Sequence, residues 1–321
     1  MTSLHSSAVA VGPLVATEAA AEPRHPSSAR RAERLRRIGL YVPMILLAVF
    51  FLFPIIFMFV SSFKADVDIF KDLGNGIDAF LPTGPLTLDN YISVANRVPV
   101  GRFLVNSLVV SLLTVALGLV VNSMMGFALA MMRWRGKTII FGLIIATLIV
   151  PFDAIAIPLL YEVTKLPQIE FQGLVPTITT NWLNSYHVQI IPFVANAFAI
   201  FLFRQFFTAV PYELIEAARI DGAGWFRIFR RIAAPLAGPA FATVAILTFL
   251  PAWNQYLWPL LVIQSEDLRP LNVGMDYFFQ LQTSWGQVMA YASIIVVPVI
   301  IFFLCFQRAF VDSVASTGVK G

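Results

Sequence analysis

The sequence predicts an all-α membrane protein with six transmembrane helices and both termini in the cytoplasm. Of its 321 residues, 58% are hydrophobic and only 12% are charged, whereas a soluble domain carries about 25% charged residues. The apolar residues stand in long blocks, and about 20 of them in a row suffice for a helix to cross a bilayer. The basic residues gather between alternate blocks, which sets the orientation.

Six segments can span. The first two contain no charged residue, and the third contains one, Asp153. The fifth is interrupted by Pro239, Pro251 and Pro259, and the sixth contains Pro298. Proline removes a backbone hydrogen bond from a helix, so we expect breaks at these residues. The six segments are Ile38–Phe63, Phe103–Met132, Thr138–Tyr161, Tyr186–Phe203, Leu236–Ile263 and Gly286–Gln307.

The distribution of charge orients these segments. With the N-terminus in the cytoplasm, the inner segments hold 16 of the 22 Lys and Arg residues and seven of the 18 Asp and Glu residues. Cytoplasmic loops of membrane proteins carry such an excess of basic residues. The net charge of +4 is therefore a topology signal, and it does not indicate nucleic-acid binding, which would need a clustered basic face.

The sequence divides the chain into three parts. Residues 1–37 are rich in Ala, Ser, Pro and Arg and read as a disordered cytoplasmic tail; a transit peptide is the alternative, although Glu18, Glu22 and Glu33 fit it poorly. Residues 38–311 form the transmembrane domain. Residues 312–321 form a short cytoplasmic tail.

The inner segment Arg204–Pro235 predicts two short helices. Pro211 suits a first helical turn and precedes a helix over Tyr212–Ile220. Gly222 is a natural left-handed stop, and a second helix fits Trp225–Ala233, ending at Pro235. The pair is partly apolar, so it lies either on the lipid headgroups or against a protein partner.

Glu216-Ala217-Ala218, Gly222, Ile232 and Pro235 stand at the spacing of the cytoplasmic signature of importer permeases, with Ala234 in place of the usual leucine. The sequence thus resembles the transmembrane permease subunits of bacterial ATP-binding-cassette importers. EAARIDGA, which includes Asp221, is typical of the branch for sugars and glycerol phosphates. The stretches FLFRQFF, WNQYLWPLL and QRAF also resemble maltose- and glycerol-3-phosphate-type permeases, and the resemblance covers Ile38–Gly321.

The resemblance implies the type I importer fold in the bacterial cytoplasmic membrane. It implies a heterodimer with a second permease, two ATPase subunits that grip the helix pair at about 211–235, and an extracytoplasmic substrate-binding protein. ATP and Mg would be held by the ATPase subunits, so this chain would bind no cofactor and would not be an enzyme. The expected coupling residues are Glu216, Ala217, Ala218, Asp221, Gly222, Ile232 and Pro235.

The sequence also shows no ATP-binding loop of its own. Gly136-Lys137-Thr138 resembles the end of the phosphate-binding pattern G-x-x-x-x-G-K-[ST], but the first glycine of that pattern would fall on Met131. With three histidines and one cysteine, we expect no metal cluster.

Two groups of residues are candidates for the translocation pathway. Asp153 is a carboxylate at membrane depth, and such groups are often functional; alternatively it reaches the outer interface or caps backbone freed by Pro151. Trp253, Asn254, Gln255 and Tyr256 lie in the interrupted fifth segment and combine aromatic faces with amides, which suits a hydroxylated solute. The alternative for this stretch is an interfacial aromatic belt.

The substrate predicted is a di- or oligosaccharide, with sn-glycerol-3-phosphate or a glycerophosphodiester as the alternative. A secondary transporter driven by an ion gradient is the remote alternative from another class, and it would need several buried ionisable groups. A membrane enzyme is a third class. We also expect the outer loop Gln264–Trp285 to contact the binding protein, or to be a plain connector, and the tail Asp312–Gly321 to lie against the ATPase subunits.

Overall fold

A computed structural model describes residues 26–74, 76–81, 84–172, 175–279 and 283–318. Most of the expected N-terminal tail, residues 1–25, and the last three residues lie outside this part. The chain divides into two units, residues 1–54 and residues 55–321, and each is described by itself.

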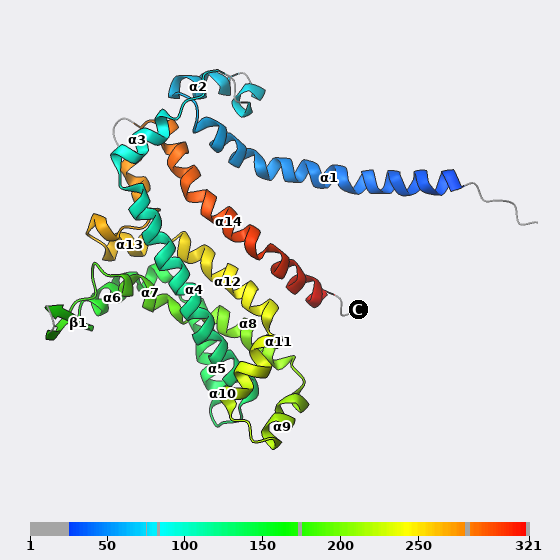
Figure 1. Cartoon of the computed structure of the whole chain (residues 1–321), viewed down its shortest axis with the longest axis vertical. Helices are drawn as coiled ribbons and strands as arrows, with labels where there is room; N and C mark the ends of the chain where they lie inside the picture. The colour runs from blue at the N-terminus through cyan, green and yellow to red at the C-terminus, as the bar shows by residue number, and fades with distance from the viewer. Residues whose placement is uncertain (1–25, 75, 82–83, 173–174, 280–282, 319–321) are drawn as a thin grey trace, which may run out of the picture. The chain divides into compact units, whose positions relative to one another are not determined.

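The described chain is helical apart from one hairpin (Figure 1). Short 3-10 turns occur at Gly76–Phe80, Thr147–Ile149, Glu266–Leu268 and Val273–Phe278, and a π turn at Phe229–Ala233. The helices are α1 (Pro26–Ser61), α2 (Asp66–Leu73), α3 (Asp89–Arg97), α4 (Val100–Met131), α5 (Lys137–Ala146), α6 (Phe152–Val163), α7 (Tyr186–Val194), α8 (Ala197–Thr208), α9 (Tyr212–Ile220), α10 (Trp225–Ile228), α11 (Ala234–Leu236), α12 (Gly238–Trp253), α13 (Leu257–Val262) and α14 (Trp285–Gly318).

Helix α1 begins before the first apolar segment. It starts at Pro26, so the last part of the predicted disordered tail, from Pro26 to Arg37, is helical. Proline is accepted in a first helical turn, and the Ala, Arg and Leu residues that follow are good helix formers. The tail expected at Asp312 is likewise helical in its backbone, because α14 continues to Gly318.

Three helices are long and apolar enough to cross a membrane, and up to six spans result if each bent helix pair counts as one. The long ones are Gly39–Ser61, Val100–Met131 and Trp285–Gln307, as the sequence predicted. The pairs are Lys137–Ile149 with Phe152–Val163, bent by 105°, Tyr186–Val194 with Ala197–Thr208, bent by 42°, and Trp225–Leu236 with Gly238–Trp253, bent by 82°.

The fifth segment is broken as predicted beside Pro239 and just before Pro259, but it runs unbroken through Pro251. Helix α12 starts beside Pro239 and runs through Pro251 to Trp253, and the chain then leaves the helix at residues 254–256. Asn272 Nδ2 donates to the Trp253 carbonyl at 2.5 Å and so caps the helix end. The break thus lies directly before Pro259, and a partner from outside the segment satisfies the carbonyl at the helix end.

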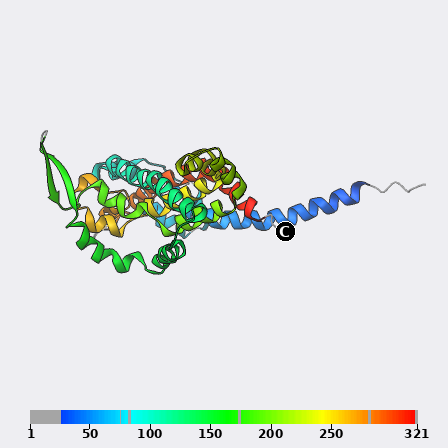
Figure 2. The same cartoon turned by 90° about the horizontal axis from the view of Figure 1, so that it is seen from below.

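The all-α prediction is wrong at one place. Strands β1 (Pro167–Gln172) and β2 (Val175–Thr180) form an antiparallel hairpin in which Ile169 pairs with Ile178. Figure 2 shows the hairpin extending away from the helices of residues 55–321. Its Thr and Ile residues favour strands, and it lies between the third and fourth predicted spans.

Within the unit formed by residues 55–321, helix α4 extends from α3 at one end towards α10 at the other (Figure 1). Two of its glycines let neighbouring backbones come close: a Cβ on Gly126 would stand 2.9 Å from Arg204 N, and one on Gly118 would stand 3.3 Å from Val194 O. Small residues permit such approach between membrane helices. Helix α4 is thus packed directly against α7 and α8.

Buried Asn122 of α4 holds the break between α7 and α8. Its Nδ2 donates to Val194 O at 2.9 Å, and its Oδ1 accepts from Asn196 N at 2.9 Å. Pro192 cannot donate to the carbonyl of Val188 one turn earlier, and that carbonyl instead accepts from Trp258 Nε1 at 2.9 Å. The backbone groups freed by the break are thereby satisfied, as an apolar surrounding requires.

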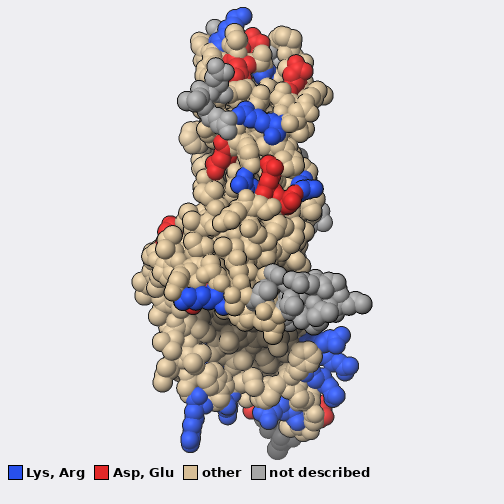
Figure 3. Space-filling view, turned by 90° about the vertical axis from the view of Figure 1, so that its left-hand side faces the viewer, with Lys and Arg blue, Asp and Glu red and all other residues tan. Residues whose placement is uncertain are grey.

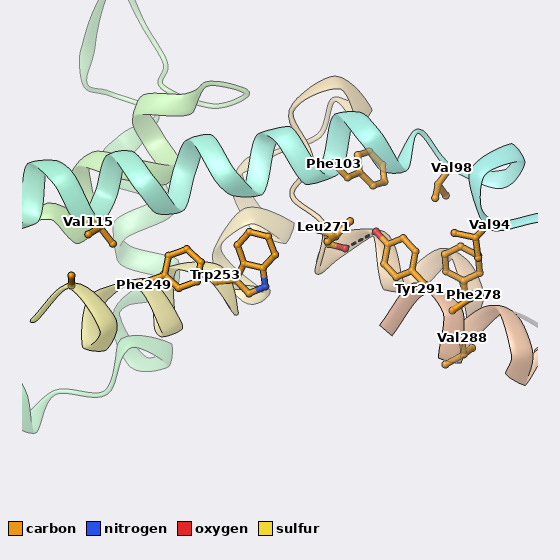
Figure 4. Packing of buried hydrophobic residues seen from close by; sticks show 12 residues of the cluster. Val94, Val98, Phe103, Val115, Phe249, Trp253, Leu271, Phe278, Val288 and Tyr291 are labelled. Carbon is orange, nitrogen blue, oxygen red and sulfur yellow. Dashed lines mark hydrogen bonds between the residues drawn. The ribbon is translucent and has the colours of Figure 1, made fainter. Parts of the chain in front are cut away.

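A buried cluster joins α3, α4, α12 and α14 at the end of the bundle that carries α3 (Figure 4). Phe249 and Trp253 of α12 stack at 5.6 Å between ring centroids. Tyr291 of α14 donates from its hydroxyl to Leu271 O at 2.6 Å, and Leu271 N donates to Ser107 Oγ at 2.7 Å. These bonds fix the segment that follows α13 to α4 and α14.

We predict that Asn122→Leu destabilises the chain, because it leaves the Val194 carbonyl and the Asn196 amide without a partner. A buried unsatisfied group costs about 1–3 kcal/mol, and interhelical hydrogen bonds in membranes are at the weaker end. Unfolding in mixed micelles should show a loss of about 1–3 kcal/mol. The control is Val121→Leu at the neighbouring, 41% exposed position. Equal stability of both variants would contradict the role given to Asn122.

Candidate functional site

Helix α9 ends in a glycine turn. Asp221 is the C-cap residue of α9, and Gly222 follows it with φ +79°. Gly222 N donates to Arg219 O at 3.0 Å, and Ala223 N donates to Ala218 O at 2.9 Å. This is the hydrogen-bond pattern of a Schellman cap. The predicted helix and its left-handed stop are confirmed in the structure.

The second helix of the pair is longer than predicted and contains a π turn. It runs without interruption through α10, Phe229–Ala233 and α11 to Leu236. Ala234 N reaches back five residues to Phe229 O. The proline ring of Pro235 would crowd the carbonyl of Arg231 in a regular helix, and the wider turn gives it room.

The helix pair is anchored to α4 and α8 by apolar side chains. Ile215 of α9 and Ile228 of α10 are both 0% exposed. Phe127 of α4 lies at the centre of this contact, with ring-centroid distances of 5.4 Å to Phe229 and 5.6 Å to Phe207 of α8. A movement of the pair would therefore be passed directly to α4 and α8.

The opposite face of the pair is open. Ile220 is 86% exposed and Phe226 is 64% exposed, which is unusual for large apolar side chains outside a lipid or protein contact. Of the predicted coupling residues, Ala218 and Ile232 are half-buried and pack towards the anchor. The exposed ones are Glu216, Ala217, Asp221, Gly222 and Pro235.

A cavity of about 620 Å³ lies beside Glu216. Arg133, from the connection between α4 and α5, stacks its guanidinium 5.2 Å from the Tyr212 ring, and Arg219 stacks 4.7 Å from the Trp225 ring. The cavity is lined by Arg133, Tyr212, Glu216, Arg219, Ile220 and Trp225. Figure 3 shows Lys and Arg side chains gathered at the lower end of the view, which is the end that carries α9 and α10 in Figure 1, and a largely uncharged band above them.

These features suit a protein contact. The cavity offers one carboxylate and two guanidinium groups that are already oriented by aromatic rings, and it lies next to exposed Ile220. Arginine fixed in this way forms directional pairs with carboxylates, and Glu216 can accept from a partner's basic group. Apolar and charged groups together are typical of a protein interface.

Trp253, Asn254, Gln255 and Tyr256 stand together where the chain leaves α12, but they contact different neighbours. Trp253 is 2% exposed and its Nε1 donates to Ile295 O of α14 at 3.2 Å. The Tyr256 hydroxyl bonds Asp276 Oδ2 at 2.8 Å. Asn254 is exposed, whereas Gln255 lines a cavity. The structure thus gives Trp253 a packing role and leaves Gln255 as the residue of this group that faces an internal space.

Asp153 does not join these residues. It is exposed and lies in the first turn of α6, directly after the bend at Pro151. A carboxylate in a first helical turn is stabilised by the positive end of the helix dipole. This position agrees with the alternative in which Asp153 serves the helix end.

The described residues of the loop Gln264–Trp285 are held in place by several polar bonds. Asn106 Nδ2 donates to Asp267 O and Arg269 O, at 2.9 Å each. Tyr277 accepts from Arg269 and donates to Glu266 Oε1 at 3.1 Å. Burial raises the pKa of Tyr277, and its bond to Glu266 raises it further. Residues 264–279 of the loop therefore present a fixed surface.

Residues 122–316, more than half of the chain, match the family described as binding-protein-dependent transport system inner membrane component. The chain belongs to this family. The resemblance inferred from the EAARIDGA stretch is thereby confirmed. The protein is thus a permease component of a transport system.

Relatives of this permease are permease proteins of two kinds of transport system. An arabinooligosaccharides transport system permease protein of Halalkalibacterium halodurans is 34% identical over 84% of this chain and 91% of its own length. The protein of the same name from Bacillus subtilis is 32% identical over 89% and 96%. An sn-glycerol-3-phosphate transport system permease protein of Salmonella typhi is 32% identical over 81% and 89%.

Solved structures support the fold of the permease. One chain of a bacterial ABC transporter for import of the acidic polysaccharide alginate aligns with a TM-score of 0.70 and 24% identity, covering 87% of this chain and 98% of that one. A chain of the alginate transporter in complex with a periplasmic protein aligns with a TM-score of 0.52 and 13% identity, covering 86% and 94%. These likenesses concern the importer permease fold alone.

We predict that Gly222→Ser impairs transport whereas Gly224→Ser does not. A Cβ at either glycine meets no atom within 4 Å, so neither substitution causes a clash. Only Gly222 has positive φ, where a side chain costs about 1–2 kcal/mol; Gly224 is the helix cap of α10, where serine is favoured. ATP-dependent uptake by the reconstituted complex measures the difference. Equal uptake by both variants would remove the requirement for this turn.

Proposed function

We propose that this permease imports a di- or oligosaccharide, together with a second permease, two ATPase subunits and an extracytoplasmic binding protein. The main support is the helix pair, which consists of α9 and of the continuous helix α10–α11. This pair is anchored on Phe127 and has an exposed face. Such a surface can receive an ATPase subunit and pass its movement to α4 and α8. The sugar follows from the arabinooligosaccharide permeases, which match over most of their length.

Glu216 is the residue proposed to bind the ATPase subunit. It is exposed on the open face of α9 and lines the cavity together with Arg133 and Arg219. A charge-assisted hydrogen bond that becomes desolvated on docking contributes about 1.5–3 kcal/mol. Asp221, Gly222 and Pro235 would set the shape of the docking face, because they are exposed where the two helices turn and end.

The orientation proposed places α9–α11 and both termini in the cytoplasm, with six spans. The charge distribution of the sequence supports it. In this orientation the hairpin β1–β2 and the loop Gln264–Trp285 lie outside, where the loop would meet the binding protein. Its fixed surface suits such a contact. The side chains of the C-terminal tail, which is proposed to contact the ATPase subunits, lie outside the described residues.

Glycerol-3-phosphate is the second candidate substrate, because the Salmonella typhi relative carries that name at 32% identity. A phosphate is bound best by Arg or Lys. The cavity that contains Gln255 is lined by uncharged residues, which favours the neutral sugar.

Glu216→Gln should lower binding-protein-stimulated ATP hydrolysis and uptake by tenfold or more, because the charged contact with the ATPase is lost. Glu213→Gln is the matched control: it lies one turn earlier on α9, is equally exposed and does not line the cavity. Both activities are measured in proteoliposomes. A similar effect of the two substitutions would mean that the helix needs negative charge in general and not Glu216.

The topology is tested by cysteine labelling. Replacing Cys305 by serine removes the single cysteine of the chain. In that background, Val67→Cys, at a residue that is 78% exposed, should react with an impermeant maleimide added to intact cells. Arg135→Cys, between α4 and α5, should react only after lysis. The reverse pattern would overturn the proposed orientation.

A further inference from the structure

An apolar groove follows the last two turns of α4. Met124, Ala128 and Met132 stand four residues apart, so they share one side of the helix. They line a groove of about 180 Å³, which extends ~12 Å along the helix axis. The opposite wall is aromatic and comes from the second helix of the pair, through Trp225, Phe226 and Phe229. A groove with such walls suits a hydrocarbon chain.

A basic cavity continues from the end of this groove. Its volume is about 450 Å³, and Met132 lines both spaces. Arg133 and Lys137 provide two positive charges in its lining, and no acidic side chain occurs among the described residues that line it. Neither cation forms an ion pair with a described residue. The cavity therefore suits an anion.

Lys137 is held at the end of α4. Its Nζ donates to Ala130 O at 3.0 Å and to Met132 O at 3.3 Å. An ammonium group has three N–H donors, so one remains for another acceptor. Arg204 of α8 brings a third positive charge to this region, because its guanidinium lies 4.1 Å from the ring of Phe141, one turn beyond Lys137 on α5.

The two spaces lie at the depth of lipid headgroups. Helix α4 has 32 residues and is therefore ~48 Å long, whereas the hydrocarbon core of a bilayer is ~30 Å thick. Its ends reach beyond the core, so the basic cavity lies near the headgroups and the groove extends from there towards the acyl chains. Trp134, which also lines the basic cavity, is 40% exposed, and tryptophan is common at membrane interfaces.

The combination of groove and cavity decides between possible occupants. A free phosphate would use the basic cavity and leave the groove empty. An apolar protein segment would fill the groove and leave Arg133 and Lys137 without a counter-charge. A phospholipid with an anionic headgroup fits both spaces. Basic pockets between membrane helices on the cytoplasmic side are suited to such headgroups.

We propose that the groove and the basic cavity together bind one anionic phospholipid, with its phosphate at Arg133 and Lys137 and an acyl chain between α4 and α10. The proposed orientation places this lipid in the cytoplasmic leaflet, whereas the site itself does not depend on the transported substrate. The lipid accounts for the 64% exposure of Phe226. It also contacts Phe229, which packs on Phe127, so it supports the helix pair against α4.

The test uses the complete complex in proteoliposomes. The probe is phosphatidylglycerol with a photoactivatable acyl chain, compared with phosphatidylcholine that carries the same chain, and mass spectrometry measures the labelling of residues 124–132. The anionic lipid should label this stretch at least fivefold more than the neutral lipid at equal mole fraction. Lys137→Gln should lower labelling by the anionic lipid at least threefold. Arg135→Gln is the matched control: it removes the same charge two residues away, at a residue that does not line the cavity, and should keep wild-type labelling.

Labelling by phosphatidylcholine shows whether the groove is intact, and it should be equal in the wild type and in both charge variants. Ala128→Phe fills the groove and should lower labelling by both lipids, whereas Met125→Phe, at a neighbouring residue that is 40% exposed and does not line the groove, should not.

Several results would overturn the proposal. Equal labelling by the two lipids, or an equal loss in Lys137→Gln and Arg135→Gln, would show that no specific headgroup contact exists. Loss of the preference for phosphatidylglycerol in excess inorganic phosphate would make the cavity a site for free phosphate. Absence of labelling at residues 124–132 of the wild type would mean that a protein subunit covers the groove.

Discussion

An apolar membrane offers no water to backbone groups, so each break in a spanning helix needs a partner from elsewhere in the chain. Buried Asn122 supplies two hydrogen bonds at the break between α7 and α8. Trp258 covers the carbonyl freed by Pro192, and Asn272 covers the end of α12. These bonds hold the broken helices in fixed positions and leave a polar cavity between them. The fold and the link to the helix pair both depend on this constraint.

The same packing connects the membrane helices to the surface proposed for the ATPase subunit. Helix α8 starts at the break that Asn122 holds, passes α4 closely at Gly126 and ends at the aromatic cluster around Phe127. Ile215 and Ile228 bury the helix pair in that cluster. A displacement of α9–α11 therefore acts on rigid, closely packed helices. Packed helices that have two discrete arrangements can carry coupling between distant sites.

Much of the fold follows from local sequence. Long apolar blocks gave the long helices, and Gly222 gave the turn of the helix pair, because a left-handed stop has a local cause. The prolines of the fifth segment indicated its breaks, whereas the bonds that Asn122 and Asn272 make at the breaks involve partners far along the chain, so a single sequence does not reveal them. A lone Asn within an apolar block is the one available signal for such a partner. The hairpin was not predicted because its strands contain many polar residues and so resemble a loop.

The central claim is that the open face of α9–α11 is covered by an ATPase subunit. Ile220 is the most direct probe, since it is 86% exposed and lies at the end of α9 beside the cavity. In the Cys305→Ser background, Ile220→Cys should react rapidly with a maleimide in the isolated permease. In the assembled complex it should be protected and should cross-link to the ATPase subunit. Equal reactivity in both preparations, with no cross-link, would contradict the account.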